Sequence, residues 1–267
     1  MVAIGAPAQT GGARGWLVVL EQELRDLWLG GRGLLLSLAF SGLLSVIAYL
    51  VATNTALNFL EQRESVNLTL QVAIAVGALL ALLAAADAVS GERERATLES
   101  LLLTPVSRME ITTGKLLAAL SLWFAAFAIT MPYVWFLGRG VGLVGHALAA
   151  GFVVGTLLAI FLASLGIVVS VFSGSNRVSL SLSLFLLLAL FAPTQLPSSA
   201  QKGWAGDLLL RINPLTAGEH YVGKIVVDGH TWAADASWLI SPVVAATLLA
   251  AIAVGVGGRW LRLSGVA

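Results

Sequence analysis

The chain has 267 residues, of which 58% are hydrophobic and only 11% are charged, and its mean hydropathy is +0.92. Soluble globular proteins carry roughly 25% charged residues, so this composition predicts a chain whose main solvent is the lipid bilayer. The net charge of +1 lacks the basic excess that nucleic-acid binding requires, and zero cysteines exclude disulfides, thiolate catalysis and cysteine-ligated metals.

The N-terminal segment, residues 1–33, contains a predicted amphipathic helix. Over Trp16–Trp28 apolar residues recur at helical spacing, and the charged residues Glu23, Arg25 and Asp26 lie between them. A helix with this pattern is expected to lie along the inner membrane surface, with its apolar face toward the acyl chains.

Six apolar stretches without Asp, Glu, Lys or Arg follow, and each approaches the roughly 20 helical residues that cross a bilayer. They predict an all-α integral membrane protein with a transmembrane domain over residues 34–258. The fifth stretch is the shortest, and Pro193 and Pro197 would let it kink or end early. The predicted spans are Leu34–Val51, Leu68–Ala86, Leu116–Leu137, Ala147–Phe172, Val178–Pro193 and Trp238–Gly258.

The basic residues between the spans predict the orientation. If both termini are cytoplasmic, ten Lys and Arg residues lie inside and five outside, as the positive-inside rule prefers. Residues 259–267 are then a cytoplasmic tail, residues 87–115 a cytoplasmic loop and residues 194–237 an outer segment. In that segment Trp204–Ile212 is followed by Asn213-Pro214, a helix stop, so we expect one or two short outer helices.

The predicted spans contain no ionisable side chain, which argues against a secondary transporter, a proton relay or a voltage sensor. Gly218–Lys224 matches only half of a phosphate-binding loop, because Ile225 replaces the Ser or Thr that would bind magnesium. His220 and His230 are interpreted as ordinary loop histidines rather than metal ligands. The chemistry that powers this protein is therefore predicted to lie on another chain.

A stripe of small residues runs along the fourth predicted span. Gly151, Gly155, Ala159 and Ala163 recur every four residues, which lets another helix approach closely. The sequence is compatible with packing inside one subunit and with a contact between two copies.

The loop between the second and third spans has an amphipathic pattern. Leu98, Leu101 and Leu102 form an i, i+3, i+4 stripe on a predicted short helix, and Pro105 ends it. Such a helix is suited to a groove on a cytoplasmic partner or to the lipid headgroup surface, and physical chemistry alone does not separate the two.

The stretch Gly91–Arg108, with the following Gly114-Lys115, resembles the coupling loop of ABC type-2 exporter permeases. The resemblance lies in a run of acidic and basic residues, Thr-Leu-Glu, paired leucines, a Pro-x-Ser-Arg element and a Gly-Lys pair. Ala96 departs from the family pattern, which usually has glycine there. Glu23-Leu24-Arg25-Asp26 and Asn213-Pro214-Leu215 also resemble family elements.

This resemblance implies a transport subunit rather than an enzyme, in a bacterial or archaeal cytoplasmic membrane. It implies two copies of a soluble ATPase that holds ATP and magnesium, and a second copy of this chain as a homodimer; no cofactor, metal or catalytic residue is assigned to the chain itself. The N-terminal helix is expected to contact the ATPase through Glu23, Arg25 and Asp26. The residues implied in coupling to the ATPase are Glu92, Glu94, Thr97, Leu98, Glu99, Leu101, Leu102, Pro105, Arg108, Gly114 and Lys115.

Three functions remain open at this point. The first is the permease of an exporter for lipids, drugs, glycans or other amphipathic molecules. The second is a transmission module that uses the same ATPase to act on an extracytoplasmic partner, for example in metalloenzyme maturation. The third is a passive channel or scaffold, against which the loop motif argues.

Overall fold

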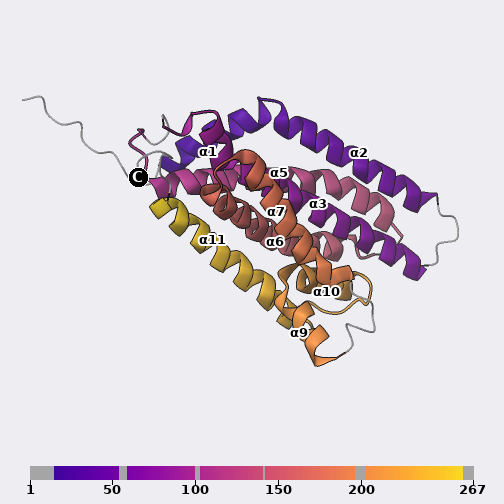
Figure 1. Ribbon diagram of the computed structural model, residues 1–267. Coiled ribbons are helices and arrows are strands. Elements are labelled where there is room, and N and C mark those ends of the chain that lie inside the picture. Colours follow the sequence, from indigo (N-terminus) through magenta and orange to yellow (C-terminus); the bar gives the residue numbers. More distant parts are fainter. Residues whose placement is uncertain (1–14, 54–58, 100–102, 141, 196–202, 261–267) are drawn as a thin grey trace, which may run out of the picture.

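The computed structural model describes residues 15–53, 59–99, 103–140, 142–195 and 203–260, and within these ranges its regular structure is helical throughout (Figure 1). The expected all-α fold is therefore confirmed. The elements are α1 (Gly15–Trp28), α2 (Arg32–Ala52), α3 (Phe59–Glu94), α5 (Arg108–Gly138), α6 (Val144–Phe172), α7 (Asn176–Phe191), η1 (Ala192–Gln195), α9 (Trp204–Ile212), α10 (Pro214–Val226), η2 (Ala236–Leu239) and α11 (Ile240–Trp260).

Five stretches of the described chain are long and apolar enough to cross a membrane. They lie in α2, α3, α5, α6 and in η2 with α11, and they correspond to five of the six predicted spans. The other predicted span forms α7, whose 16 residues rise only about 24 Å, less than the roughly 30 Å of a hydrocarbon core. The helix ends there because Pro193 falls within the 3₁₀ turn η1. Six complete crossings therefore remain a prediction.

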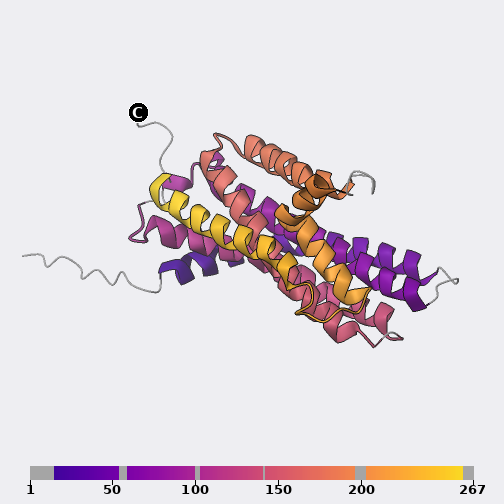
Figure 2. The ribbon, with the colours of Figure 1, turned by 90° about the horizontal axis from the view of Figure 1, so that it is seen from below.

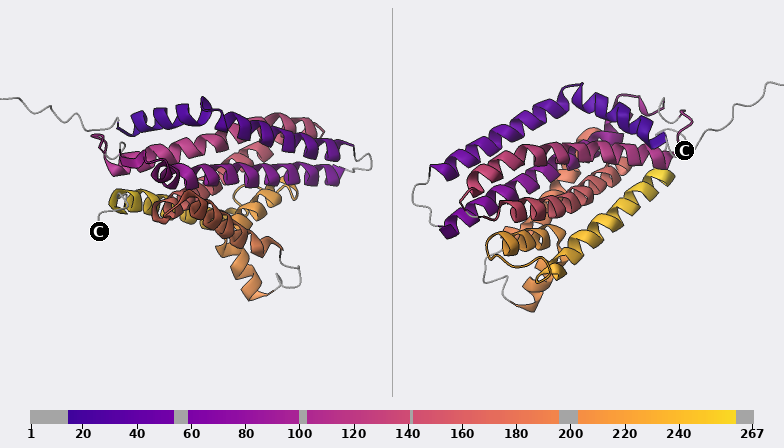
Figure 3. Two further views of the ribbon diagram at one scale, coloured as in Figure 1. Left: turned by 45° about the horizontal axis from the view of Figure 1, so that its top comes forward. Right: turned by 180° about the vertical axis from the view of Figure 1, so that it is seen from behind.

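Helix α1 begins, and helix α11 ends, at the same end of the bundle (Figure 1). Gly15, at the start of α1, lies against Glu110 of α5, and Gly258, near the end of α11, lies against Met109 of α5. We call this the α1 end, and the opposite end, where α9 and α10 lie, the α10 end. Figure 3 shows α9 projecting away from the long helices there.

Helix α6 forms the centre of the bundle, because α3, α5, α10 and α11 all pack against it. Figure 2 shows α11 running along the outside of the long helices. The small-residue stripe of α6 is buried inside the subunit: Gly151 faces Leu70 of α3, and Gly155 faces Trp123 of α5. The Trp123 indole N–H also donates to Thr156 Oγ1 at 3.0 Å. The stripe therefore serves packing within one chain.

Helix α2 lies at the edge of the bundle and has few buried side chains. Phe40 and Leu44 anchor it to the α3 and α5 side, and the Tyr133 hydroxyl lies 2.7 Å from Ser45 Oγ. Leu38 and Tyr49 are 71% and 67% exposed. In a bilayer such a surface is covered by lipid or by another protein.

We predict that Gly155→Ala destabilises the fold. An added Cβ would lie 2.1 Å from Cη2 of Trp123, so the indole must move, and overpacking of this kind lowers the free energy of unfolding by about 1–3 kcal/mol. Gly145→Ala is the matched control in the same helix, because nothing lies within 4 Å of its added Cβ. Thermal unfolding in detergent would measure both, and equal midpoints would contradict the packing described.

Candidate functional site

A buried lysine joins three helices at the α1 end. Lys115 of α5 has a side chain only 1% exposed, and its Nζ lies 2.5 Å from Glu23 Oε1 of α1 and 2.6 Å from Glu92 Oε1 of α3. Burying an ammonium without a partner costs several kcal/mol, so the two carboxylates are required where Lys115 lies. Glu23 and Glu92 are 92 and 23 positions away from it in the sequence.

The residue before the lysine lets α1 come this close. An added Cβ at Gly114 would lie 2.8 Å from Val19 Cβ and 3.0 Å from the carbonyl oxygen of Trp16. Any other residue would push α1 away from α5 and lengthen the ion pair between Glu23 and Lys115. Gly114 therefore permits the close approach of α1 to α5, and Lys115 forms the ion pair with Glu23 across it.

A second ionic cluster adjoins the first and is centred on Asp87 of α3. Arg32, at the start of α2, donates to Asp87 Oδ2 at 3.0 Å, and Arg95 in the following loop donates to it at 3.2 Å. Asn176, at the start of α7, donates to Oδ1 at 2.6 Å. Arg93 donates to the carbonyl oxygens of Ser173 and Val171 at the end of α6. The end of α3 is thereby connected to α2, α6 and α7.

Buried hydroxyl groups extend this connection into the bundle. Ser170 of α6 and Ser179 of α7 both donate to the carbonyl oxygen of Ala86 in α3, each at 2.7 Å. Ser179 therefore makes a contact between α7 and α3.

An amphipathic cavity of about 420 Å³ opens between α1, α2, α3, α5 and α7. Charged groups of both ionic clusters line one part of it, and leucine and alanine side chains line the rest. The charged residues are Glu23, Asp26, Arg32, Asp87, Glu92, Arg95 and Lys115, and the leucines are Leu27, Leu35, Leu36, Leu83 and Leu180.

The residues predicted to couple to an ATPase separate into two sets. Leu98, Gly114 and Lys115 are buried and Glu92 is partly buried, so these four act inside the subunit. Leu101 and Leu102 lie outside the described residues. The exposed set, which a partner can touch, is Glu94, Thr97, Glu99, Pro105 and Arg108.

The three residues predicted in the N-terminal helix also differ in their surroundings. Glu23 pairs with Lys115, Asp26 lines the cavity, and Arg25 forms an exposed ion pair with Glu21 at 2.6 Å. Only Glu23 is part of the buried cluster.

Both ends of the loop are fixed by defined caps. The Thr97 N–H donates to the Glu92 carbonyl oxygen and the Ala96 N–H to that of Arg93, a Schellman motif that closes α3. At the other end Ser107 and Glu110 form a capping box that opens α5. The serine of the Pro-x-Ser-Arg element is this cap.

Ala96 has a φ of 56° and is the one non-glycine residue in the described chain with a positive φ. Glycine is the usual residue at this position of a Schellman motif, because it has no Cβ to oppose left-handed geometry. Ala96 therefore makes the end of α3 strained.

We predict that Lys115→Met lowers the free energy of unfolding by about 3–5 kcal/mol, because it leaves the Glu23 and Glu92 carboxylates without a counter-charge. Adding Glu23→Gln and Glu92→Gln should recover most of this loss. Lys224→Met is the control, since Lys224 forms a partly exposed i, i+4 pair with Asp228. Thermal unfolding of all three variants is the measurement, and a triple variant no more stable than the single one would contradict the ionic explanation.

We also predict that Ala96→Gly raises the free energy of unfolding by about 1 kcal/mol, because it removes the left-handed strain. Ala149→Gly, at an exposed position in α6, should lower it by about the same amount. The melting temperature should rise in Ala96→Gly and fall in Ala149→Gly. A lower melting temperature in both variants would show that Ala96 is not strained.

Comparison with known proteins places this chain in a family. Residues 17–258 match the family described as ABC-2 family transporter protein. A search of curated proteins finds no match to the chain. The matched segment begins in α1 and ends in α11, so it includes both ionic clusters and the loop between α3 and α5. The chain belongs to the ABC-2 family of transporter proteins, as a membrane-embedded permease subunit.

Proposed function

We propose that this permease subunit serves an ATP-driven exporter of amphipathic molecules, with two copies of a separate ATPase and a second copy of this chain. Its α1 end faces the cytoplasm of a bacterial or archaeal cell, as the distribution of basic residues favours. Family membership supports the ATPase partner, whereas export, the copy numbers and the cargo are part of the proposal.

The observation that carries the proposal is the ion pair of Lys115 with Glu23 and Glu92. The ATPase contacts the exposed loop residues Glu94, Thr97 and Glu99, and its closure on ATP moves the loop. Because Lys115 holds α1, α3 and α5 together, the displacement reaches two long helices at once as a rigid-body movement.

The cavity at the α1 end supports an amphipathic cargo. Its charged part can hold a polar headgroup, and its leucine wall can hold an acyl chain or ring system. Helix α2 forms one wall and has few buried side chains, so its displacement would open the cavity toward the membrane.

We predict that Glu99→Arg weakens the contact with the ATPase. The measurement is the rate of Mg·ATP hydrolysis that copurifies with the tagged chain in a mild detergent. Loss of about 1.4 kcal/mol of binding energy would reduce the retained ATPase roughly tenfold at limiting concentration. Glu64→Arg is the matched control, because Glu64 is an exposed glutamate in the first turns of α3, far from the loop.

Equal retention by both variants would contradict docking through this loop. If the wild-type chain, intact and folded, retains no ATP hydrolysis, the ATPase partner itself is ruled out under these conditions and a passive role becomes the better explanation. An additional extracytoplasmic protein in the purified complex would instead favour the transmission module.

A further inference from the structure

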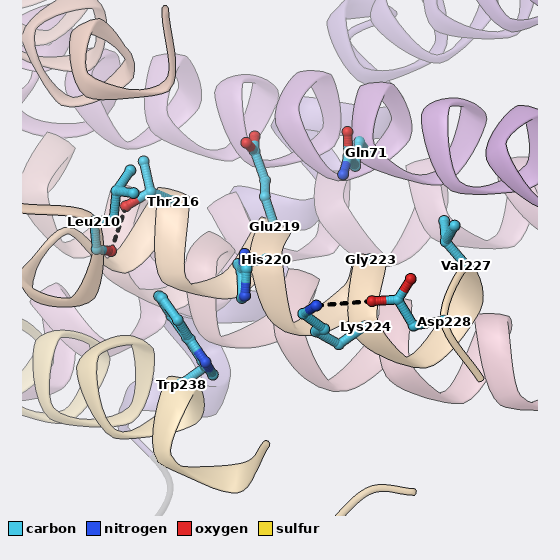
Figure 4. Close-up of a pocket in the computed structure, with 10 residues that line it drawn as sticks. All are labelled: Gln71, Leu210, Thr216, Glu219, His220, Gly223, Lys224, Val227, Asp228 and Trp238. Carbon is cyan, nitrogen blue, oxygen red and sulfur yellow. Dashed lines mark hydrogen bonds and ion pairs between the residues drawn. The ribbon is translucent and has the colours of Figure 1, made fainter. Parts of the chain in front are cut away.

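A second cavity lies at the α10 end, far from the coupling loop. It is an open cavity of about 340 Å³, lined by residues of α3, α9, α10 and η2 and of the turn after α10 (Figure 4). Gln71 of α3 and Glu219 of α10 line one side, and Trp238 of η2 lies on another.

Most charged and aromatic groups of this cavity already have partners. Lys224 forms an ion pair with Asp228 at 2.8 Å, and the rings of His220 and Trp238 lie with their centroids 4.0 Å apart. Burial and the nearby Lys224 lower the pKa of His220, so its neutral form is favoured near pH 7. The lysine and aspartate cancel each other in charge.

Glu219 differs from these groups. Among the described residues its carboxyl makes no hydrogen bond and no ion pair, and Figure 4 shows it directed from α10 toward α3, on the same side as Gln71. Burial raises its pKa from 4.5 to about 7. Above that pH the cavity therefore contains a carboxylate that forms no ion pair with a basic side chain of the described residues.

A further unsatisfied acceptor lies on the adjoining face of α3. Asn67 is one turn before Gln71, and its Oδ1 is buried without a hydrogen-bond partner. Its amide lies near Gly223, which is one turn after Glu219 on α10. Asn67 does not line the cavity, so Glu219 is the acceptor that a ligand there can reach, and its carboxylate favours a ligand that brings positive charge and N–H groups.

We propose that the cavity between α3 and α10 binds a primary amine in its ammonium form, with the Glu219 carboxylate as its counter-ion. An ammonium group supplies both a positive charge and three donors. An anionic ligand would instead be repelled by the Glu219 carboxylate. Leu210, Val227 and Trp238 contact the apolar part of the ligand. This proposal does not depend on the ATPase or on the cargo.

The site has a defined pH dependence. Protonation of Glu219 removes the counter-ion, so binding is strong above its pKa of about 7 and weak below it. Between pH 8 and pH 6 the ionised fraction falls about tenfold, and the affinity should fall equally. Other charged or titratable groups on the elements around the cavity include Arg63 and Glu64 in the first turns of α3, Asp207 and Arg211 on α9, His220, Tyr221 and Lys224 on α10, Asp228 after α10, and His230 and Asp235 before η2.

Hexylammonium is a suitable probe, because an alkylammonium stays charged at both pH values, and hexan-1-ol is its neutral match. Saturation-transfer NMR on the full chain in nanodiscs would give the affinity at pH 6 and pH 8. The variants are Glu219→Gln and Glu219→Asp, with Glu64→Gln as the control that removes an exposed charge from α3.

Wild type and Glu64→Gln should bind hexylammonium about tenfold more tightly at pH 8 than at pH 6. Glu219→Gln should bind weakly and without pH dependence, and Glu219→Asp should keep the pH dependence. If Glu219→Gln does not fold, the proposal is still tested by the pH dependence of binding to Glu219→Asp and by the comparison of hexylammonium with hexanol. Unchanged binding in a folded Glu219→Gln variant, equal binding of hexanol, or no specific signal in wild type would each overturn the proposal.

Discussion

The requirement that a buried ammonium keep its carboxylate partners organises the α1 end of this protein. Lys115 is almost completely enclosed, so neither Glu23 nor Glu92 can move far from it without leaving charge unpaired in a medium of low dielectric constant. The helices that contribute these groups are therefore constrained to move together. Asp87, with Arg32, Arg95 and Asn176, extends this constraint to α2 and α7. An apolar contact of the same size would allow sliding, whereas these directional ion pairs oppose it.

The charged side chains at the two ends of the bundle are paired to different extents. At the α1 end, acidic and basic side chains from several helices lie within 3.2 Å of one another. At the α10 end, Lys224 and Asp228 satisfy each other and Glu219 faces the cavity without a partner. A compensated cluster stabilises one arrangement of helices, while an uncompensated carboxylate makes the local structure sensitive to protons and cations. The first property suits force transmission, and the second suits recognition.

Features that depend on neighbouring residues in the sequence could be predicted, whereas contacts between residues far apart in the sequence could not. Hydropathy is a local property, so five long apolar helices were found close to their predicted positions. Helix α7 is shorter than a full crossing because Pro193 lies in the turn that follows it. The pair of Lys115 with Glu23 joins positions 92 residues apart, and no local pattern indicates it. The Gly-Lys element drew attention to Lys115, whose side chain faces the interior of the subunit rather than the surface.

The described ends of the loop between α3 and α5 are exposed at the surface and are also held to the bundle. They are fixed by a Schellman motif after Glu94 and a capping box at Ser107, and Leu98 is anchored in the apolar core. Glu94 and Glu99 remain at the surface, so recognition by a partner relies there on charge, while the apolar side chain attaches the loop to the bundle. Under the proposed function, a force applied at Glu94 or Glu99 would act close to the end of α3, where Glu92 is bound to Lys115.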